Sequence, residues 1–405
     1  MNQVSQQPGG RMLRSQTLKL SYVFPIVLQW RQLAKKGFLI PAALTILASM
    51  TLFWSATKSF DYFAWAFAVY CAIIFLYFVY RLCGKPRSWV VLLSAMGIGV
   101  LFAYPSHYNV WGVLHLFFAN FVAAAIFPHG SLGGFGFNFV AIGLVEEGTK
   151  FAVVLLFYGV ALKCASPWRE QIGVAEPLDG IVLGAASGAG FALFETVHQY
   201  IPNALAKSIP IPVLVQFTNT KILPHSPKLA KLPPVVILKM VQGFIASNFS
   251  MQAIINIFHV NGALAMQLLI TRSLNDLAGH MAWAALFGYA LGLAVLKPKK
   301  GWMALPLCYA LVAALHALWD SSTSLPMETQ VIAGLLSYSL LAAAILQARQ
   351  LSPTREFNFA TQTLERLKTP AAQPANSVQN APVRSQVAQP RVSPVQPAGY
   401  ALILG

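Results

Sequence analysis

Ten apolar runs, each close to the length that crosses a lipid bilayer, follow one another along this sequence of 405 residues. A transmembrane α-helix needs about 20 consecutive, mostly apolar residues. Only 10% of the residues are charged, against about 25% in an ordinary soluble domain. The chain therefore lacks the polar surface of a soluble fold, and we predict an all-α, polytopic transmembrane helix bundle of about ten spans (eight to ten) around a polar intramembrane cavity. The predicted spans cover residues 38–56, 61–81, 88–104, 110–127, 138–163, 178–203, 250–270, 279–296, 301–320 and 329–348.

The positive charge of the chain indicates how these spans are oriented. The formal net charge is +16, which is compatible with nucleic-acid binding, but the apolar runs favour a membrane partner and we predict no nucleic acid. Basic residues collect in cytoplasmic loops of membrane proteins. The basic clusters at 1–36, 81–87, 204–249 and 297–300, together with the tail, are therefore all predicted to be cytoplasmic. This predicts a multi-pass protein of the cell membrane with both termini in the cytoplasm.

The composition divides the chain into three regions. A basic N-terminal segment covers residues 1–36, a multi-span membrane domain covers 37–348, and 349–405 is predicted to be a largely disordered tail that is rich in Pro, Gln, Ala and Val towards its end. A Lys- and Pro-rich insert at 204–249, without a single acidic residue, interrupts the membrane domain. Its short apolar patches are expected in the membrane interface, where its lysines can reach anionic lipid headgroups. Anionic lipid is therefore a predicted partner.

A few ionisable residues lie where charge is most expensive. A charged side chain at the bilayer centre costs at least about 2.5–3.5 kcal/mol on insertion scales, so such residues usually have a function. The chain has only 12 acidic residues, yet several lie inside or at the edge of apolar spans. The ionisable residues of this kind are Glu146, Glu147, Lys150, Glu195, His280, His316 and Asp320.

Two adjacent glutamates share one lysine in the span 138–163. Glu146 and Glu147 precede Lys150 by four and three residues, so both carboxylates can reach the same ammonium on a helix. Two neighbouring carboxylates cannot both ionise cheaply in a low dielectric, which favours a general base that works near neutral pH. A buried ion pair that only fixes helix packing is the alternative, although one glutamate would suffice for it.

The span 178–203 combines small residues with one deep carboxylate. Gly184, Gly188 and Ala192 recur at four-residue spacing and favour close helix packing. Glu195 follows on the same helix with no basic residue within one turn, so it needs a partner from another span.

Two histidines and an aspartate provide candidates for that partner. His316 and Asp320 are four residues apart and share a helix face, a spacing that suits two metal ligands or a histidine oriented by a carboxylate. His280 opens an otherwise uncharged helix. Each histidine taken singly is compatible with a packing role. Burial of the whole set, however, costs the least free energy when these side chains form hydrogen bonds and ion pairs with one another.

The predicted spans contain one conflict of depth. Glu195 lies late in its span and His280 lies early in its own, and the predicted span 250–270 separates them. Under simple alternation these two ends face opposite sides of the membrane, unless both spans shift.

Four short segments in this region follow one another in a characteristic order. They are a double glutamate with a basic residue three positions on (Glu146-Glu147-Gly-Thr-Lys150), Phe191-Ala-Leu-Phe-Glu195, the stretch Arg272 to His280 followed by Gly288-Tyr289-Ala-Leu-Gly292, and His316-Ala-Leu-Trp-Asp320. This order resembles the motifs of the PrsW family of intramembrane proteases, which belongs to a superfamily with the CAAX prenyl proteases and bacteriocin-processing enzymes. The resemblance covers a core at about 138–322, and the insert 204–249 and the tail depart from it.

The resemblance implies hydrolysis of peptide bonds in membrane-protein or peptide substrates. Glu146 or Glu147 would be the general base, with Lys150 and Arg272 in support. The remaining residues would either bind a divalent metal, zinc being the expected one, or form a metal-free network that stabilises an oxyanion. Two other classes stay open at this point, a transporter or proton-linked channel and an inactive membrane scaffold. The residues expected in this second group are Glu195, His280, His316 and Asp320.

Overall fold

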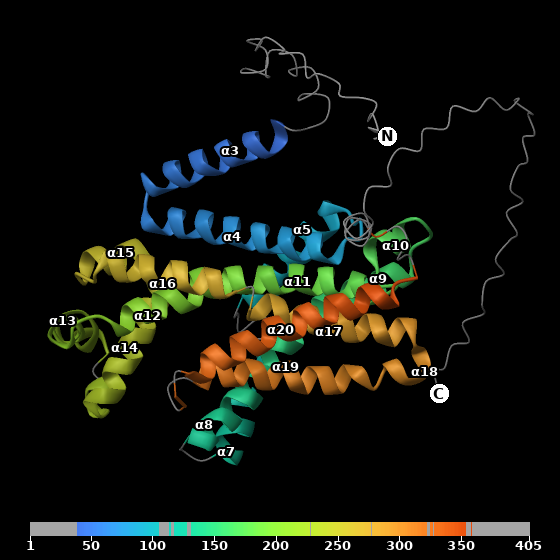
Figure 1. Ribbon diagram of the computed structural model, residues 1–405. Helices are drawn as coiled ribbons and strands as arrows, with labels where there is room; N and C mark the ends of the chain where they lie inside the picture. Colours follow the sequence, from blue (N-terminus) through green and yellow to red (C-terminus); the bar gives the residue numbers. More distant parts are fainter. Residues whose placement is uncertain are drawn as a thin grey trace, which may run out of the picture. The chain divides into compact units, whose positions relative to one another are not determined.

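Every regular element that the structure describes is a helix, as predicted (Figure 1). The computed structural model describes residues 39–104, 113–114, 117–127, 131–226, 228–276, 278–321, 325–326, 328–353 and 358. All of them belong to one unit, Met1–Gln362. The predictions about residues 1–36, and about the tail after residue 358, lie outside the described residues.

The helices follow the predicted apolar runs closely along most of the chain. Most are α-helices, and short π-helical or 3-10 segments (η) join several of them into longer rods. Their bounds are α3 Leu39–Ala56, α4 Phe60–Cys83, α5 Trp89–Ala103, η1 Phe118–Ala123, α7 Ala124–Ile126, α8 Ser131–Asn138, η2 Phe139–Gly143, α9 Leu144–Leu162, α10 Trp168–Ile172, α11 Pro177–Phe194, η3 Glu195–Tyr200, α12 Ile201–Lys207, α13 Ile211–Phe217, η4 Thr218–Ile222, η5 Leu223–His225, η6 Leu229–Lys231, α14 Pro234–Asn248, α15 Met251–Ile257, α16 Gly262–Asn275, α17 His280–Leu296, α18 Pro298–Gly301, α19 Ala304–Asp320 and α20 Glu328–Leu351.

Fewer helices than the predicted ten meet the length and composition of a membrane span. Four stretches among the described residues do so: Phe60–Cys83, Pro177–Lys207, Gly262–Leu296 and Glu328–Leu351. Other apolar helices are shorter, including Pro41–Ala56, Trp89–Ala103, Pro234–Asn248 and Ala304–Asp320. The apolar helices support a membrane protein, but a count of ten spans is not reached by this criterion.

The prediction of one continuous span over 250–270 was wrong. The helix α15 ends at Ile257, and His259 takes a left-handed backbone conformation with φ 54°. Asn261 then caps α16 by accepting a hydrogen bond from the backbone N–H of Ala263 at 2.9 Å. A helix cannot continue through a left-handed residue, so the apolar run is divided into two short helices. Apolar content alone does not reveal this break.

This break removes the conflict of depth between Glu195 and His280. Glu195 lies near the middle of the stretch Pro177–Lys207 and His280 lies near the middle of the stretch Gly262–Leu296, so the two residues meet at one depth. The rod α11–η3–α12 ends at Lys207, at one end of the bundle (Figure 1). The helices α12 to α14 lie at that end, whereas α18, with Lys299 and Lys300, lies at the other. The insert and the 297–300 loop, which the sequence predicts on one side of the membrane, thus lie toward different ends of the bundle.

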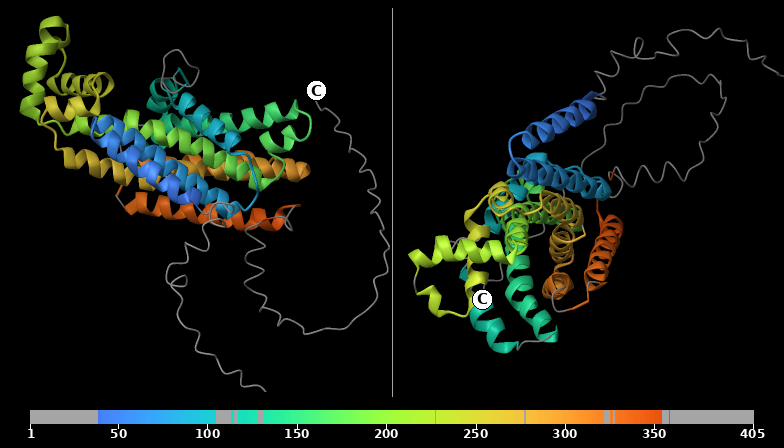
Figure 2. Two further views of the ribbon diagram at one scale, coloured as in Figure 1. Left: turned by 90° about the horizontal axis from the view of Figure 1, so that it is seen from above. Right: turned by 90° about the vertical axis from the view of Figure 1, so that its left-hand side faces the viewer.

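A seam of glycines joins α11 and α17 in antiparallel register. A Cβ atom on Gly180 would collide with the carbonyl of Gly288, one on Gly184 with that of Ala284, and one on Gly188 with that of His280. Only glycine permits this approach of two backbones. Every residue of α11 is buried, in agreement with its central place in both views of Figure 2. The seam sets the depth at which α17 begins relative to Glu195.

The N-terminal end of α11 is held in place by ion pairs. Asp179 Oδ1 forms ion pairs with Lys85 Nζ at 2.8 Å and with Arg87 Nη2 at 2.9 Å. Asp179 and Glu176 also form a capping box at the first turn of α11. Acidic residues are favoured at helix N-termini. The ion pairs therefore fix the first turn of α11, and the glycine seam fixes the rest of the helix against α17.

Candidate functional site

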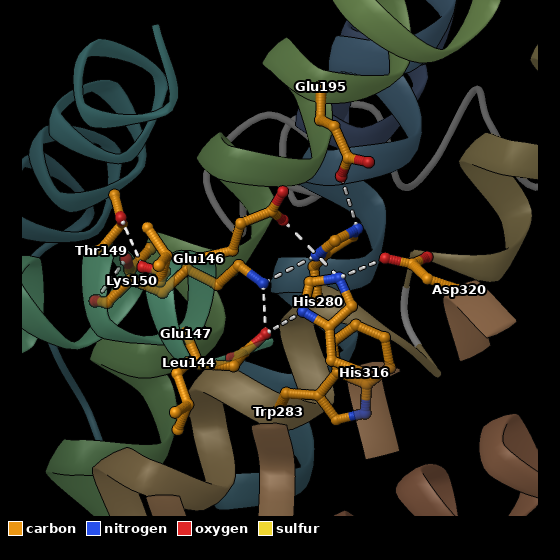
Figure 3. Close-up of polar contacts among 12 residues, drawn as sticks. Leu144, Glu146, Glu147, Thr149, Lys150, Glu195, His280, Trp283, His316 and Asp320 are labelled. Atoms are coloured by element: carbon orange, nitrogen blue, oxygen red, sulfur yellow. Dashed lines mark hydrogen bonds and ion pairs between the residues drawn. The ribbon is translucent and has the colours of Figure 1, made fainter. Parts of the chain in front are cut away.

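The predicted polar residues gather where four helices meet. The helix α9 carries the double glutamate near its start, η3 begins at Glu195, α17 begins at His280, and α19 carries His316 and ends at Asp320 (Figure 3). Gly143 packs on the backbone of Ala313, which brings the start of α9 against the second half of α19. The structure thus brings all the predicted site residues into one connected network.

Glu147 is fully buried and has two charged or polar partners. Its Oε1 accepts from Lys150 Nζ at 2.5 Å and lies 2.8 Å from His316 Nδ1. A carboxylate can only accept, so the Nδ1 nitrogen of His316 is the donor in this contact. Glu147 therefore orients the His316 ring and leaves its Nε2 nitrogen directed into the site.

Lys150 connects this pair to the second histidine. Its Nζ atom lies 2.8 Å from His280 Nδ1. The side chain is completely buried between two aromatic faces, with Nζ 4.5 Å from the Phe191 ring centroid and 5.4 Å from that of Trp283. Lys150 thus fixes the orientation of His280 as Glu147 fixes that of His316.

The basic partner of Glu195 is Arg272 of α16. Glu195 Oε2 accepts from Arg272 Nη2 at 2.8 Å and lies 2.7 Å from His280 Nε2. The same Nε2 atom also lies 2.7 Å from Arg272 Nη2, so it faces both a cation and a carboxylate. The arginine reaches across 77 residues of sequence, which explains why the helix of Glu195 supplies no base of its own.

Glu146 is the least committed carboxylate of the cluster. Its Oε2 lies 3.6 Å from His316 Nε2 and is buried without a hydrogen-bond donor among the described residues. Asp320 Oδ2 lies 3.3 Å from the same nitrogen. The side chain of Glu146 is 17% exposed, whereas that of Glu147 is 0% exposed. Both glutamates have an Oε2 atom without a hydrogen-bond partner among the described residues, but only the side chain of Glu146 is partly exposed.

This arrangement groups side chains that could bind a metal ion. With Nδ1 of His316 donating to Glu147, the Nε2 lone pair faces two carboxylates, and three electron-rich atoms converge. A proton or a metal cation at this point would compensate the repulsion between them. One ligand atom each from Glu146, His280 and His316 lies within 4.8 Å of the other two. Two imidazoles with a carboxylate form the donor set of an open zinc site.

This trio differs in part from the predicted metal ligands. It contains His280 and His316, but its carboxylate is Glu146, which the sequence indicated as a base. Of the other two predicted ligands, Glu195 is held by Arg272 and His280, and Asp320 lies beside His316.

An aromatic residue that sequence reasoning passed over forms one wall of the site. Trp283 stacks on His316 with ring centroids 4.5 Å apart and an interplanar angle of 23°. Its indole Nε1 donates to Ser337 Oγ of α20 at 2.8 Å. The position of Trp283 one helical turn after His280 was a signal for this role, whereas nothing in the sequence indicated Ser337.

Comparison with known proteins agrees with the motifs. A family model described as PrsW family intramembrane metalloprotease matches residues 85–217 and 238–347, which is more than half of the chain. No curated protein and no solved structure gives a significant match. The matched residues include the whole network described above. The chain is therefore a membrane protease, a hydrolase, and it belongs to the PrsW family of intramembrane metalloproteases.

Proposed function

We propose that this chain hydrolyses peptide bonds of membrane-protein substrates at the cluster described above, with Glu146 as the general base. The observation that carries the proposal is that Glu146, with its Oε2 atom 3.6 Å from His316 Nε2 and free of hydrogen bonds among the described residues, is the partly exposed glutamate of the pair. A general base must have a free basic oxygen at the site of proton transfer. Glu147, the other predicted base, uses its Oε1 atom to hold Lys150 and His316.

The surrounding residues have positioning roles in this proposal. Glu146 takes the proton of the attacking water and can return it to the leaving nitrogen. Glu147 keeps His316 Nε2 directed at the site, and Lys150 does the same for the His280 ring. Arg272 holds Glu195 at 2.8 Å and thereby fixes the partner of His280 Nε2. Such indirect partners typically change activity or metal affinity by about 10–100-fold.

We propose the metal-dependent form of this chemistry, with zinc held by His280, His316 and a carboxylate of the cluster. Glu195 and Asp320 are the proposed carboxylate ligands, which leaves Glu146 available as the base. When bound, zinc would supply Lewis acidity that polarises the scissile carbonyl and activates water. The proximity of the His280 and His316 rings to each other, with Asp320 Oδ2 3.3 Å from His316 Nε2 and Glu195 Oε2 2.7 Å from His280 Nε2, supports this form.

We further propose that the protein crosses the cell membrane several times, with both termini in the cytoplasm, and we retain the predicted division into 1–36, 37–348 and 349–405. Membership of a protease family favours hydrolysis over transport and over an inactive scaffold.

The test compares newly formed protein N-termini in membrane fractions of cells that express different variants. Wild-type protein should create N-termini that disappear in the Glu146→Gln,Glu147→Gln variant, since glutamine keeps the shape but loses the basic oxygen. The single Glu146→Gln change should lower the cleavage rate by about 10²–10⁴-fold. Glu170→Gln, an exposed position on α10, is the matched control and should leave cleavage intact. Unchanged cleavage in the double variant would remove the assignment of this site.

A further inference from the structure

We infer that α13, α14 and the segment between them form a surface that binds anionic lipid headgroups. We call residues 204–249 the basic insert. The part of it at 218–237 lies between the two segments that match the family model, 85–217 and 238–347. This surface is therefore argued from its own residues and is independent of the proposed catalytic site.

The charge of the basic insert has one sign. It has no aspartate or glutamate, so its lysines have no acidic partner within the segment. Each of these lysines is exposed in the structure. Exposed lysines near a membrane attract anionic headgroups by about 1 kcal/mol each. The lysines are Lys207, Lys221, Lys228, Lys231 and Lys239.

An apolar stripe accompanies the lysines on α14. Val236, Met240 and Phe244 recur at four-residue spacing and are 39%, 49% and 46% exposed. A different stripe of the same helix, Ile237 and Val241 with Ile245, is buried against the rest of the protein. The exposed stripe is therefore additional to the one that packs α14.

The helix α13 repeats this pattern on a smaller scale. Ile211 and Val215, also four residues apart, are 68% and 39% exposed. Both helices therefore direct apolar side chains outward in a segment whose charges are all positive.

The position and length of α14 favour the interface over the hydrocarbon core. It has 15 residues, or about 22 Å of helix, which is shorter than the hydrocarbon core of about 30 Å. Lys239 is exposed in its middle, where a spanning helix would place it deep in lipid. Figure 1 shows α12 to α15 beside one end of α11, where the bundle would leave the membrane. Apolar stripes bordered by lysines are typical of helices that lie in the plane of a membrane surface.

A soluble acidic peptide is the competing occupant. It would use the lysines but would leave the exposed stripes of α13 and α14 uncovered in water. A lipid surface satisfies both features, because lysine stems lie along acyl chains while the ammonium groups reach phosphates. The two features together therefore favour lipid.

The test measures the lipid that full-length protein retains, by native mass spectrometry after release from nanodiscs. The nanodiscs contain phosphatidylcholine alone or mixed with phosphatidylglycerol. Wild-type protein should retain phosphatidylglycerol selectively. Lys221→Gln,Lys228→Gln,Lys231→Gln should lower the retained amount at least about fivefold, the effect of losing about 1 kcal/mol. The matched control is Lys297→Gln,Lys299→Gln,Lys300→Gln, which removes equal charge at the opposite end of the bundle and should have a smaller effect.

A second variant examines the apolar contribution without changing charge. Met240→Gln,Phe244→Gln alters exposed side chains, so its thermal stability in detergent should match that of wild type while retained lipid falls. Equal lipid loss from both lysine variants would show that net charge alone attracts lipid and would overturn the inference. So would a lysine variant that keeps its lipid but loses binding of an acidic peptide, because that result assigns the surface to peptide docking. Lipid retention does not depend on catalysis, so failure here leaves the proposed function unaffected.

Discussion

Gly188 of α11 packs directly on the carbonyl oxygen of His280, the first residue of α17. Seven residues further along the same rod, Glu195 reaches His280 Nε2 at 2.7 Å. A contact between two backbones thus determines the depth at which a carboxylate and an imidazole meet. The glycine seam belongs to the site as much as to the fold, because a shift between α11 and α17 would separate them.

The seam predicts a strong effect of one added methyl group. Gly184→Ala should destabilise the protein by roughly 1–3 kcal/mol, the usual cost of overpacking, because its Cβ would meet the backbone of Ala284. Gly159→Ala on α9 is the matched control, since a Cβ there meets nothing within 4 Å. Thermal unfolding of both variants in detergent gives the measurement. Equal melting temperatures would contradict the close packing.

Lys150 predicts a strongly non-additive pair of substitutions. Lys150→Met leaves the buried carboxylate of Glu147 without its cation, and breaking a buried pair costs about 3–5 kcal/mol. Adding Glu147→Gln removes the unpaired charge and should recover much of this loss. Unfolding free energies of the two single variants and the double variant form the required cycle. Additive effects would mean that the two side chains do not interact as described.

Metal content separates the proposed ligands from the proposed base. His280→Ala and His316→Ala should each lower bound zinc, measured as zinc per protein after purification, because each removes a nitrogen donor. Glu146→Gln should keep its zinc and lose cleavage. His198→Ala serves as control, since this exposed histidine lies outside the cluster. A wild-type enzyme without metal that cleaves at full rate in chelator would discard the metal-dependent form.

Substitution of Arg272 tests whether this residue contributes to activity by positioning Glu195. Arg272→Gln removes the cation that holds Glu195 and should lower cleavage by about 10–100-fold, with weakened retention of zinc. Arg169→Gln, an exposed arginine on α10, should change neither quantity. Normal zinc affinity and normal cleavage in Arg272→Gln would show that the 2.8 Å contact has no role in the site.

Local physics allowed a large part of this protein to be predicted from its sequence. The cost of charge in lipid is a property of each residue, so the unusual acids and histidines could be identified without coordinates. The contact between Glu147 and Lys150 follows from helix geometry at a spacing of three residues. The glycines at four-residue spacing likewise predicted close packing, although not against which helix.

Tertiary structure alone decided how these residues are used. Glu146 and Glu147 are adjacent and chemically identical, yet packing against α19 places Glu147 2.8 Å from His316 Nδ1 and leaves Glu146 partly exposed at 3.6 Å from His316 Nε2. Arg272 and Glu195 lie 77 residues apart, a pairing that no local pattern contains. The left-handed backbone conformation of His259 interrupts residues 250–270, which hydropathy predicts to be one span. Hydropathy sums side chains over a window, whereas depth and partnership depend on backbone geometry and on contacts between distant segments, and those exist only once the helices have packed.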